Sequence, residues 1–434
     1  MSSDWPVLPL EECLDALIDY RGKTPDKTAA GVPLVTAKVI KGGRIETPTE
    51  FIASDAYESW MRRGIPQAGD VVLTMEAPLG EVAQLGHERV ALAQRVVTLR
   101  GKAGLLDSTF LLYLLQTEEL QGQLRARATG TTVLGIKQSE LRKISLSLPP
   151  IELQRSSAAV LAAIDARIDV ARETNATLEA IAQALFKSWF VDFDPVRAKH
   201  QGLAPAGMDE DTAALFPDSF TDKELGSIPT GWPIAPFTDT VDVVGGGTPK
   251  TSVADYWNGD IPWFSVVDAP SGADTFVVTT QKSITAVGLQ NCASRLLPRG
   301  TTIISARGTV GRLALVGRAM AMNQSCYGLR GKAGDSYFTY FTTRGLVDSL
   351  KQRSHGSVFD TITRETLASV SVIAPPAVVV ILFDETVMPV MQRIRQNLLQ
   401  ARTLATLRDT LLPRLICGQL RLPESQEACQ EALA

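Results

Sequence analysis

The stretch that decides the fold lies in the middle of the chain and reads, from Pro149 to Pro195, PPIELQRSSAAVLAAIDARIDVARETNATLEAIAQALFKSWFVDFDP. Its apolar and small positions recur in alternating steps of three and four, at Leu161, Ile164, Ile168, Ala171, Asn175, Leu178, Ala182, Leu185 and Trp189. This spacing is typical of a coiled-coil seam, which is narrower than the apolar face of a helix in a globular core. No Gly or Pro interrupts the stretch between Pro150 and Pro195. It therefore predicts a helix of about 40 residues, roughly 60 Å long, with a partner helix along the seam.

A second copy of this pattern lies 226 residues further along (375 − 149), from Pro375 to Ile416. Each copy begins after a Pro pair, and Pro suits a first helical turn because the N–H that it lacks would have no partner there. Without a gap, the apolar positions Leu161, Ile164, Ile168, Leu178, Ile181, Leu185 and Phe190 align with Val387, Val390, Ile394, Leu404, Leu407, Leu411 and Ile416. The chain thus supplies its own partner helix through an internal repeat.

The residues before the first helix read as mixed α and β structure. Predicted strands are GVPLVTAKVI (31–40), GDVVLTMEAP (69–78), RVVTLRG (95–101) and KISLSLP (143–149). The segment STFLLYLLQTEELQGQLRARA (108–128) has the Leu and Tyr spacing of a helix that packs on a sheet.

Residues 232–374 repeat this first part. WPVLPL (5–10) returns as WPIAPF (232–237), GDVVLTMEAPLGEVA (69–83) as GTTIISARGTVGRLA (300–314), QRVVTLRGKAG (94–104) as QSCYGLRGKAG (324–334) and TGTTVLGI (129–136) as HGSVFDTI (355–362). The framework agrees between the copies, whereas loop residues differ, as EAP against ARG does. Two similar but unequal domains are expected, each followed by a long helix.

The predicted fold class is α+β with two mixed α/β domains. Residues 191–232 are rich in Pro, Asp and Gly, which indicates a linker and the domain boundary. The expected parts are a first domain (1–148), a long helix (149–195), a linker (196–231), a second domain (232–374), a second long helix (375–418) and a C-terminal tail (419–434).

Composition and motifs argue against catalysis by this chain. Gly22-Lys23-Thr24 resembles the end of a phosphate loop, but Leu17 stands where the first Gly is required. No amino-methyltransferase string, zinc-protease motif or nucleophile elbow occurs, and the three histidines are isolated, so no metal site is expected. Five cysteines without paired spacing read as buried thiols, and no signal pattern or membrane-length apolar run is present. These features predict a cytoplasmic protein.

Basic residues cluster once in each half, although the net charge of the chain is −4. The first cluster, between positions 21 and 44, includes Lys38, Lys41 and Arg44; the second, between 299 and 330, holds five arginines and no acid. Clusters of this kind can bind phosphates and read base edges. A solvated basic face is the alternative interpretation, and the recurrence in both halves favours nucleic acid.

Four strings then carry a resemblance to a known family. ALFKSWFVDFDPVRAK (184–199), ALFPDSF (214–220), LGSIPTGW (225–232) and LRDTLLPRLICGQLRL (407–422) resemble the DNA-specificity subunit of Type I restriction-modification systems. The family often has Glu-Gln after the Pro pair, where the second repeat has only valines from 378 to 380, and Ser is more usual at Cys417.

The resemblance implies a non-catalytic subunit with two target-recognition domains, related by a pseudo-twofold and separated by two long antiparallel helices. Each domain would read one half of a split, asymmetric target in double-stranded DNA, and the helices would set the spacer between the halves. Two methyltransferase (modification) subunits, with S-adenosylmethionine, would methylate adenine N6. Restriction (translocase/nuclease) subunits, with ATP and Mg²⁺, would cleave unmodified DNA. No cofactor is expected in this chain, and no membrane partner.

Candidate DNA-binding residues lie in three loops of each domain. The first domain contributes residues 38–44, 75–78 and 130–137, and the second contributes 266–271, 306–309 and 356–361. The individual candidates are Lys38, Lys41, Arg44, Glu76, Thr131, Lys137, Asp268, Arg307, Thr309, His355 and Ser357. Arg307 is the strongest candidate for a base contact, since Arg to guanine is the commonest specific pairing.

The register of the coil can also be predicted. With antiparallel helices centred near residues 173 and 399, Asn175 lies opposite Asn397, Ala171 opposite Ala401 and Ile168 opposite Leu404. A buried Asn pair fixes the register at a cost in stability.

Two rival interpretations stay open. A structural coiled-coil scaffold with protein-binding domains explains the helices, but not two domains that share a framework and differ in their loops. A methyltransferase–nuclease fusion with a recognition tail would need the catalytic motifs that the sequence lacks.

Overall fold

The computed structural model describes residues 5–20, 24–270, 274–353 and 361–420. It forms two compact units, Met1–Ile168 with Thr403–Ala434, and Asp169–Arg402. The division lies inside the two long helices and not in the segment 191–232 where the composition changes. The reason is that each half of the helices packs with the domain beside it, and the segment 191–232 packs within the second unit.

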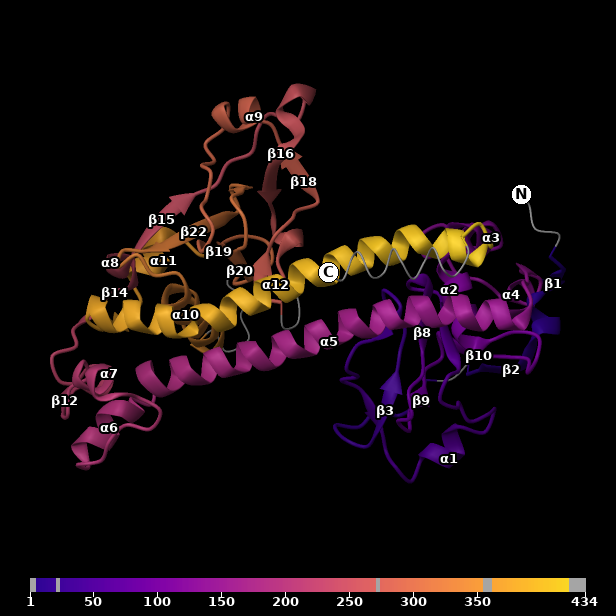
Figure 1. The fold of residues 1–434 in the computed structure, drawn as a ribbon, viewed down its shortest axis with the longest axis horizontal. Coiled ribbons are helices and arrows are strands. Elements are labelled where there is room, and N and C mark those ends of the chain that lie inside the picture. Colours follow the sequence, from indigo (N-terminus) through magenta and orange to yellow (C-terminus); the bar gives the residue numbers. More distant parts are fainter. Residues whose placement is uncertain (1–4, 21–23, 271–273, 354–360, 421–434) are drawn as a thin grey trace. The chain divides into compact units, whose positions relative to one another are not determined.

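The two long helices are α5 (Ile151–Phe190) and α12 (Ala377–Ile416), of 40 residues each (Figure 1). Both bounds differ by 226 residues (377 − 151 and 416 − 190), as the repeat predicts. The valines after the second Pro pair do not delay the start of α12. The first helix ends at Phe190, five residues before the expected Pro195, and Phe193, which precedes the next helix, takes a left-handed conformation with φ of 57°.

The first domain contains a mixed set of short elements. They are β1 (Val7–Pro9), the 3-10 helix η1 (Leu10–Cys13), β2 (Leu14–Asp19), β3 (Val32–Val35), β4 (Ile40–Lys41), β5 (Arg44–Ile45), β6 (Phe51–Ile52), α1 (Tyr57–Trp60), β7 (Val71–Met75), β8 (Leu79–Gln84), β9 (Ala91–Leu92), β10 (Val96–Gly101), α2 (Ser108–Gln116), α3 (Glu118–Ala126), α4 (Gln138–Leu141) and β11 (Ser145–Ser147). The central sheet has the order β2-β10-β7-β8 and is antiparallel. Smaller pairings join β6-β3-β9, β4-β5 and β1-β11.

Helix α2 packs on the central sheet, as predicted, because six consecutive apolar or aromatic residues from Phe110 to Leu115 are buried. The expected single helix over 108–128 is nevertheless wrong. Thr117 is extended, and its hydroxyl accepts a hydrogen bond from the N–H of Leu120, so that it ends α2 and caps α3. The expected strand 31–40 is also broken, since β3 ends at Val35 and a turn precedes β4.

The second domain is built from a similar set. It comprises β14 (Ile234–Pro236), α8 (Phe237–Thr240), β15 (Val241–Gly245), η2 (Ala254–Tyr256), β16 (Trp257–Phe264), η3 (Val266–Asp268), β17 (Phe276–Val277), β18 (Lys282–Ile284), α9 (Ala286–Gln290), β19 (Thr302–Ser305), β20 (Leu313–Val316), β21 (Ala321–Met322), β22 (Cys326–Gly331), α10 (Tyr337–Arg353), α11 (Arg364–Ala368) and β23 (Ser371–Ile373). Its main sheet has the order β15-β22-β19-β20-β17, beside the sheet β18-β16-β21 and the pair β14-β23.

The internal repeat is therefore a repeat of topology. The first four strands of the second main sheet occupy the positions of β2, β10, β7 and β8, and β16 pairs parallel to β21 as β3 pairs to β9. Even a side-chain bond recurs: the hydroxyl of Thr74 accepts the N–H of Glu81 at 2.9 Å, and that of Ser305 accepts the N–H of Arg312 at 2.8 Å. The added strand β17 makes the two domains unequal.

The segment expected to be a linker is ordered. It forms α6 (Asp194–His200), α7 (Glu210–Ala214) and the hairpin β12 (Phe220–Lys223) with β13 (Gly226–Pro229). Phe193, Val196, Phe216 and Trp232 are buried in a cluster with the end of α5. Burial of these side chains stabilises the ordered conformation of the segment, and its composition alone did not predict this.

The predicted Asn pair is confirmed in the second unit. Asn397 donates a 2.9 Å hydrogen bond from Nδ2 to Oδ1 of Asn175, and Asn175 donates one of 3.1 Å to the carbonyl of Ile394. The rings of Phe186 and Phe383 are 5.8 Å apart further along, so α5 and α12 run antiparallel. The other two predicted layers, Ala171 with Ala401 and Ile168 with Leu404, stay predictions.

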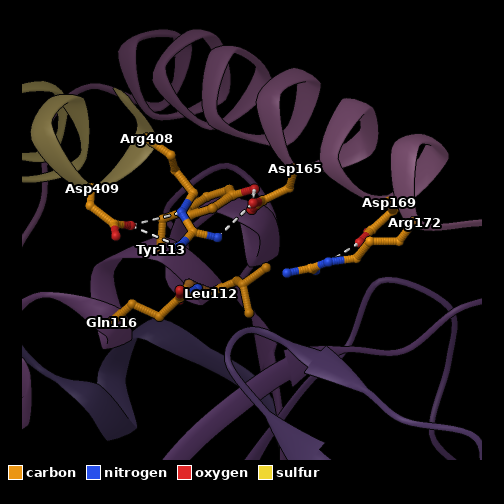
Figure 2. A network of polar contacts seen from close by, with 8 residues as sticks. All are labelled: Leu112, Tyr113, Gln116, Asp165, Asp169, Arg172, Arg408 and Asp409. Atoms are coloured by element: carbon orange, nitrogen blue, oxygen red, sulfur yellow. Dashed lines mark hydrogen bonds and ion pairs between the residues drawn. The ribbon is translucent and has the colours of Figure 1, made fainter. Parts of the chain in front are cut away.

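A polar network joins the elements of the first unit (Figure 2). The carboxylate of Asp165 on α5 accepts hydrogen bonds from the hydroxyl of Tyr113 on α2, at 2.8 Å, and from Nη1 of Arg408 on α12, at 2.7 Å. Arg408 also contacts Asp409, at 2.8 Å. Burial lowers the pKa of Arg408, but the two carboxylates outweigh it and raise the pKa, so the charge of the network is maintained.

Three expectations from the sequence can be compared with the described residues. Cys13 and Cys326 are buried as expected, and burial raises the pKa of the Cys326 thiol to about 12, but Cys292 is half-buried and Cys417 is exposed. Within the described ranges no helix combines the length and the apolar character needed to cross a membrane, and no cluster of three or more metal-ligating side chains occurs.

Candidate nucleic-acid interface

In the first domain, two of the three predicted loops meet at the turn between β7 and β8. The N–H of Ile136 donates a 3.0 Å hydrogen bond to the carbonyl of Met75, and Glu76 forms a β-bridge with Gly135. The loop of residues 130–137 therefore lies along the turn of residues 75–78. Thr131 and Lys137 are exposed beside it, as is Glu76.

The third predicted loop of this domain is the hairpin of β4 and β5, which contacts β8. Gly42 and Gly43 at its turn have φ values of 55° and 84°, and only glycine adopts this pair without strain. The N–H of Gly42 donates to the Glu81 carboxylate at 2.9 Å, which holds the turn against the strand. Lys41 and Arg44 flank the turn, and the three loops therefore gather around one β-hairpin.

The second domain repeats this arrangement at the turn between β19 and β20. The N–H of Ile362 donates a 2.8 Å hydrogen bond to the carbonyl of Ala306, and Arg307 forms a β-bridge with Thr361. Arg312 Nη2 donates to the carbonyl of Pro270 at 2.8 Å, which attaches the loop that begins at Val266. Arg307 and Thr309 are exposed at the turn.

The predicted residues differ in what their side chains are free to do. Lys38 is exposed, Arg44 is half-buried, and Lys41 forms an exposed ion pair with Glu46, at 2.8 Å. The carboxylate of Asp268 is occupied by its own loop, since it accepts the N–H and hydroxyl of Ser265 and the N–H of Gln281. These hydrogen bonds order the loop and leave the Asp268 carboxylate less available to accept a hydrogen bond from a DNA base. His355 and Ser357 lie outside the described residues.

Basic side chains lie near Glu140, which follows the loop 130–137. A hydrogen bond from Lys143, with the charges of Arg127 and Lys137 nearby, holds the pKa of Glu140 below its usual value. In the second domain, the Arg307 guanidinium makes no hydrogen bond or ion pair with any residue in the described ranges. Such a side chain is available for an outside acceptor.

The sequence patterns did not single out Arg95, which lies beside Glu76. Its Nε is 3.0 Å from Oε1 of Glu76, and both side chains are about half exposed, at 49% and 48%. The alignment of the two repeats could have identified Arg95. Arg95 of QRVVTLRG is exposed and aligns with Ser325 of QSCYGLRG, so the repeats differ at this position.

The first of the strings that carry the family resemblance, residues 184–199, is structural. Trp189, Phe190 and Phe193 from ALFKSWFVDF are buried in the aromatic cluster, and Phe186 packs against it. Lys187 forms an ion pair with Asp192. This string therefore holds the end of α5.

Comparison with known proteins gives a consistent result. The family model for the Type I restriction modification DNA specificity domain matches residues 4–180 and 229–379. The chain is 24% identical over 377 residues to the Type I restriction enzyme HindI specificity subunit of Haemophilus influenzae, covering 77% of this chain and 82% of that relative. It is 26% identical over 442 residues to the MjaIX specificity subunit of Methanocaldococcus jannaschii, covering 97% and 94%.

A solved structure agrees at the level of the fold. The crystal structure of the Type-I restriction-modification system S subunit from M. genitalium aligns with a TM-score of 0.55 at 15% identity, over 95% of this chain and 96% of that one. The family model covers both repeats, which are the two domains whose loops gather around a hairpin. The chain therefore belongs to the family of the Type I restriction modification DNA specificity domain.

Proposed function

We propose that this chain is the sequence-recognition subunit of a Type I restriction-modification complex. Each domain reads one half of a split, asymmetric DNA target through the loops around its hairpin, and α5 with α12 sets the spacer. The chain carries out no chemistry itself. It acts in the cytoplasm and directs adenine-N6 methylation and cleavage by partner subunits.

The observation that carries this proposal is the contrast between framework and loops in the two domains. The turns after β7 and β19 have the same backbone hydrogen bonds, yet they present Glu76 in one domain and Arg307 in the other. A protein that reads two different half-sites needs this combination, because one framework positions the loops and different side chains specify the bases. A scaffold with no DNA to read would not require it.

The partners are those that the family resemblance implies, and the charge of the chain is consistent with them. With a net charge of −4, the chain supplies few of the phosphate contacts that dominate DNA affinity. Two methyltransferase subunits, with S-adenosylmethionine, would supply most of them and close around the duplex. Restriction subunits, with ATP and Mg²⁺, would then cleave unmethylated DNA.

The test is base-resolution mapping of N6-methyladenine in cells with and without this gene. We expect one two-part, non-palindromic motif that disappears with the gene. Replacing residues 232–374 with the corresponding domain of a relative should change one half of the motif only. Methylation that is unaffected by loss of the gene, or a domain replacement that changes both halves, would contradict the proposal. The first of these outcomes would favour the scaffold interpretation.

A further inference from the structure

The positions of Glu76 and Arg95 in the first domain correspond to those of Arg307 and Ser325 in the second. The N–H of Met75 donates to the carbonyl of Arg95 at 2.9 Å, and the N–H of Ala306 donates to the carbonyl of Ser325 at 2.7 Å. The residues that follow, Glu76 and Arg307, each form the β-bridge to the returning loop. Two adjacent side-chain positions are therefore equivalent in the two frameworks.

Each domain carries one arginine at this pair of positions, but the arginine occupies a different member of the pair in each domain. In the second domain Arg307 lies on the turn after β19, with Ser325 across from it. In the first domain the arginine is Arg95, which precedes β10, and Glu76 occupies the turn. A guanidinium is thus presented at the corresponding place in both domains.

The ion pair of Arg95 leaves its terminal nitrogens available. Glu76 Oε1 approaches Nε, at 3.0 Å, and neither Nη group donates a hydrogen bond to any residue in the described part of the chain. The two Nη groups form the fork that binds O6 and N7 of guanine, and a carboxylate on Nε restricts the rotation of the side chain. Ion pairs this exposed contribute little to stability, so folding does not explain the pair.

We propose that Arg95 is the specificity-determining residue of the first domain, that it reads a guanine in the first half-site, and that Glu76 is its positioning residue. This inference rests on the proposed function. The alternative, in which Glu76 reads a base that donates from an amino group, is disfavoured, because Arg95 engages its carboxylate and DNA phosphates repel it. Each half of the target should then contain a G·C pair that is read by arginine, Arg95 in one half and Arg307 in the other.

The experiment uses the full chain, expressed with its methyltransferase subunits in cells, and maps N6-methyladenine for the variants R95A, R95K, E76Q and R307A. R95K keeps the charge but lacks the fork. We expect R95A and R95K to relax one G·C position, in one half-site only, and to reduce methylation of the wild-type motif about tenfold or more. E76Q should have a smaller effect at the same position, and R307A should affect the other half-site.

A matched control is R125A. Arg125 also has a side chain that is 49% exposed in an ion pair, with Glu118, but it lies on α3 and belongs to none of the three loops. Its motif and methylation level should equal those of the wild type, and unchanged thermal unfolding shows that each variant is folded.

Three outcomes would overturn the inference while the proposed function stands. They are an unchanged motif in R95A, a loss of methylation in R95A without any change of base preference, which indicates a phosphate contact, and a change of base preference in E76Q without one in R95K. A wild-type complex that produces no two-part motif would instead overturn the proposed function, and this inference with it.

Discussion

Asp384 shows how a single residue of α12 orders the helix packed beside it. Its carboxylate accepts the backbone N–H groups of Ser336, Tyr337 and Phe338 at the start of α10, at 2.6–3.2 Å. Burial raises the pKa of Asp384 to about 6, although the three N–H groups act in the opposite direction. Its usual value is 3.8, so the folded chain binds this proton more tightly than the unfolded chain does.

This pKa predicts a pH-dependent stability. A raised pKa in the folded state contributes stability that is complete below about pH 4 and is lost as the pH rises through about 6. The variant D384N keeps an oxygen acceptor but cannot titrate. We expect the difference in unfolding free energy, wild type minus D384N, to fall by about 1–2 kcal/mol between pH 5 and pH 7.5. Urea unfolding at both pH values measures it, and a difference that does not depend on pH would contradict the prediction.

At the scale of the element, the Asn175–Asn397 pair fixes the register of α5 against α12 but lowers the stability of the coil. The two buried amides bond to each other, and slipping the helices would leave each facing aliphatic side chains. Leu at both positions would pack without unpaired polar groups and would favour no single register.

We therefore expect the double variant N175L/N397L to melt at a higher temperature than the wild type and to have a less defined register. N175L alone should be destabilised by about 1–3 kcal/mol, because the Asn397 amide then loses its partner. Thermal unfolding measures the first effect. Spin labels at Glu173 and Gln400, with Cys292, Cys417 and Cys429 replaced by Ser, measure the second as a broader distance distribution. A double variant with a lower melting temperature and an unchanged distribution would refute this view of the pair.

At the scale of the whole molecule, the continuity of the helices matters, because α5 and α12 each run for 40 residues without a break. If they set the spacer of the DNA target, lengthening both by one turn should lengthen the spacer alone. Four residues inserted between Ala171 and Asn175, with four between Asn397 and Ala401, add about 6 Å to each helix. The seam shifts by only a fraction of a turn, which a coil can absorb.

We expect the methylated motif of this insertion variant to gain about one or two base pairs of spacer, since DNA rises about 3.4 Å per base pair. Both half-sites should stay the same. The same four residues placed in the β12–β13 turn, between Glu224 and Leu225, serve as the control and should leave the motif unchanged. Altered bases within a half-site would show that the helices do more than set a distance.

The sequence by itself determined the features that depend on periodicity and repetition. The seam of three and four predicted both long helices, the offset of 226 residues related their bounds, and the position of Asn175 predicted its partner across the coil. It also predicted which loops carry the divergent residues, since aligned repeats reveal what differs on a shared framework. Periodicity and repetition can be read along the sequence, so these predictions do not require knowledge of the packing.

Only the tertiary structure decided what depends on contacts between residues far apart in the chain. It gathered the loops 38–44 and 130–137 around the β7–β8 hairpin of the first domain, occupied the carboxylate of Asp268 and placed Arg95 beside Glu76. It also ordered the segment 191–232, whose composition resembles a linker, by burying Phe216 and Trp232. Hydrogen bonds and apolar burial of this kind pair groups by position in space, so no pattern along the sequence could specify them.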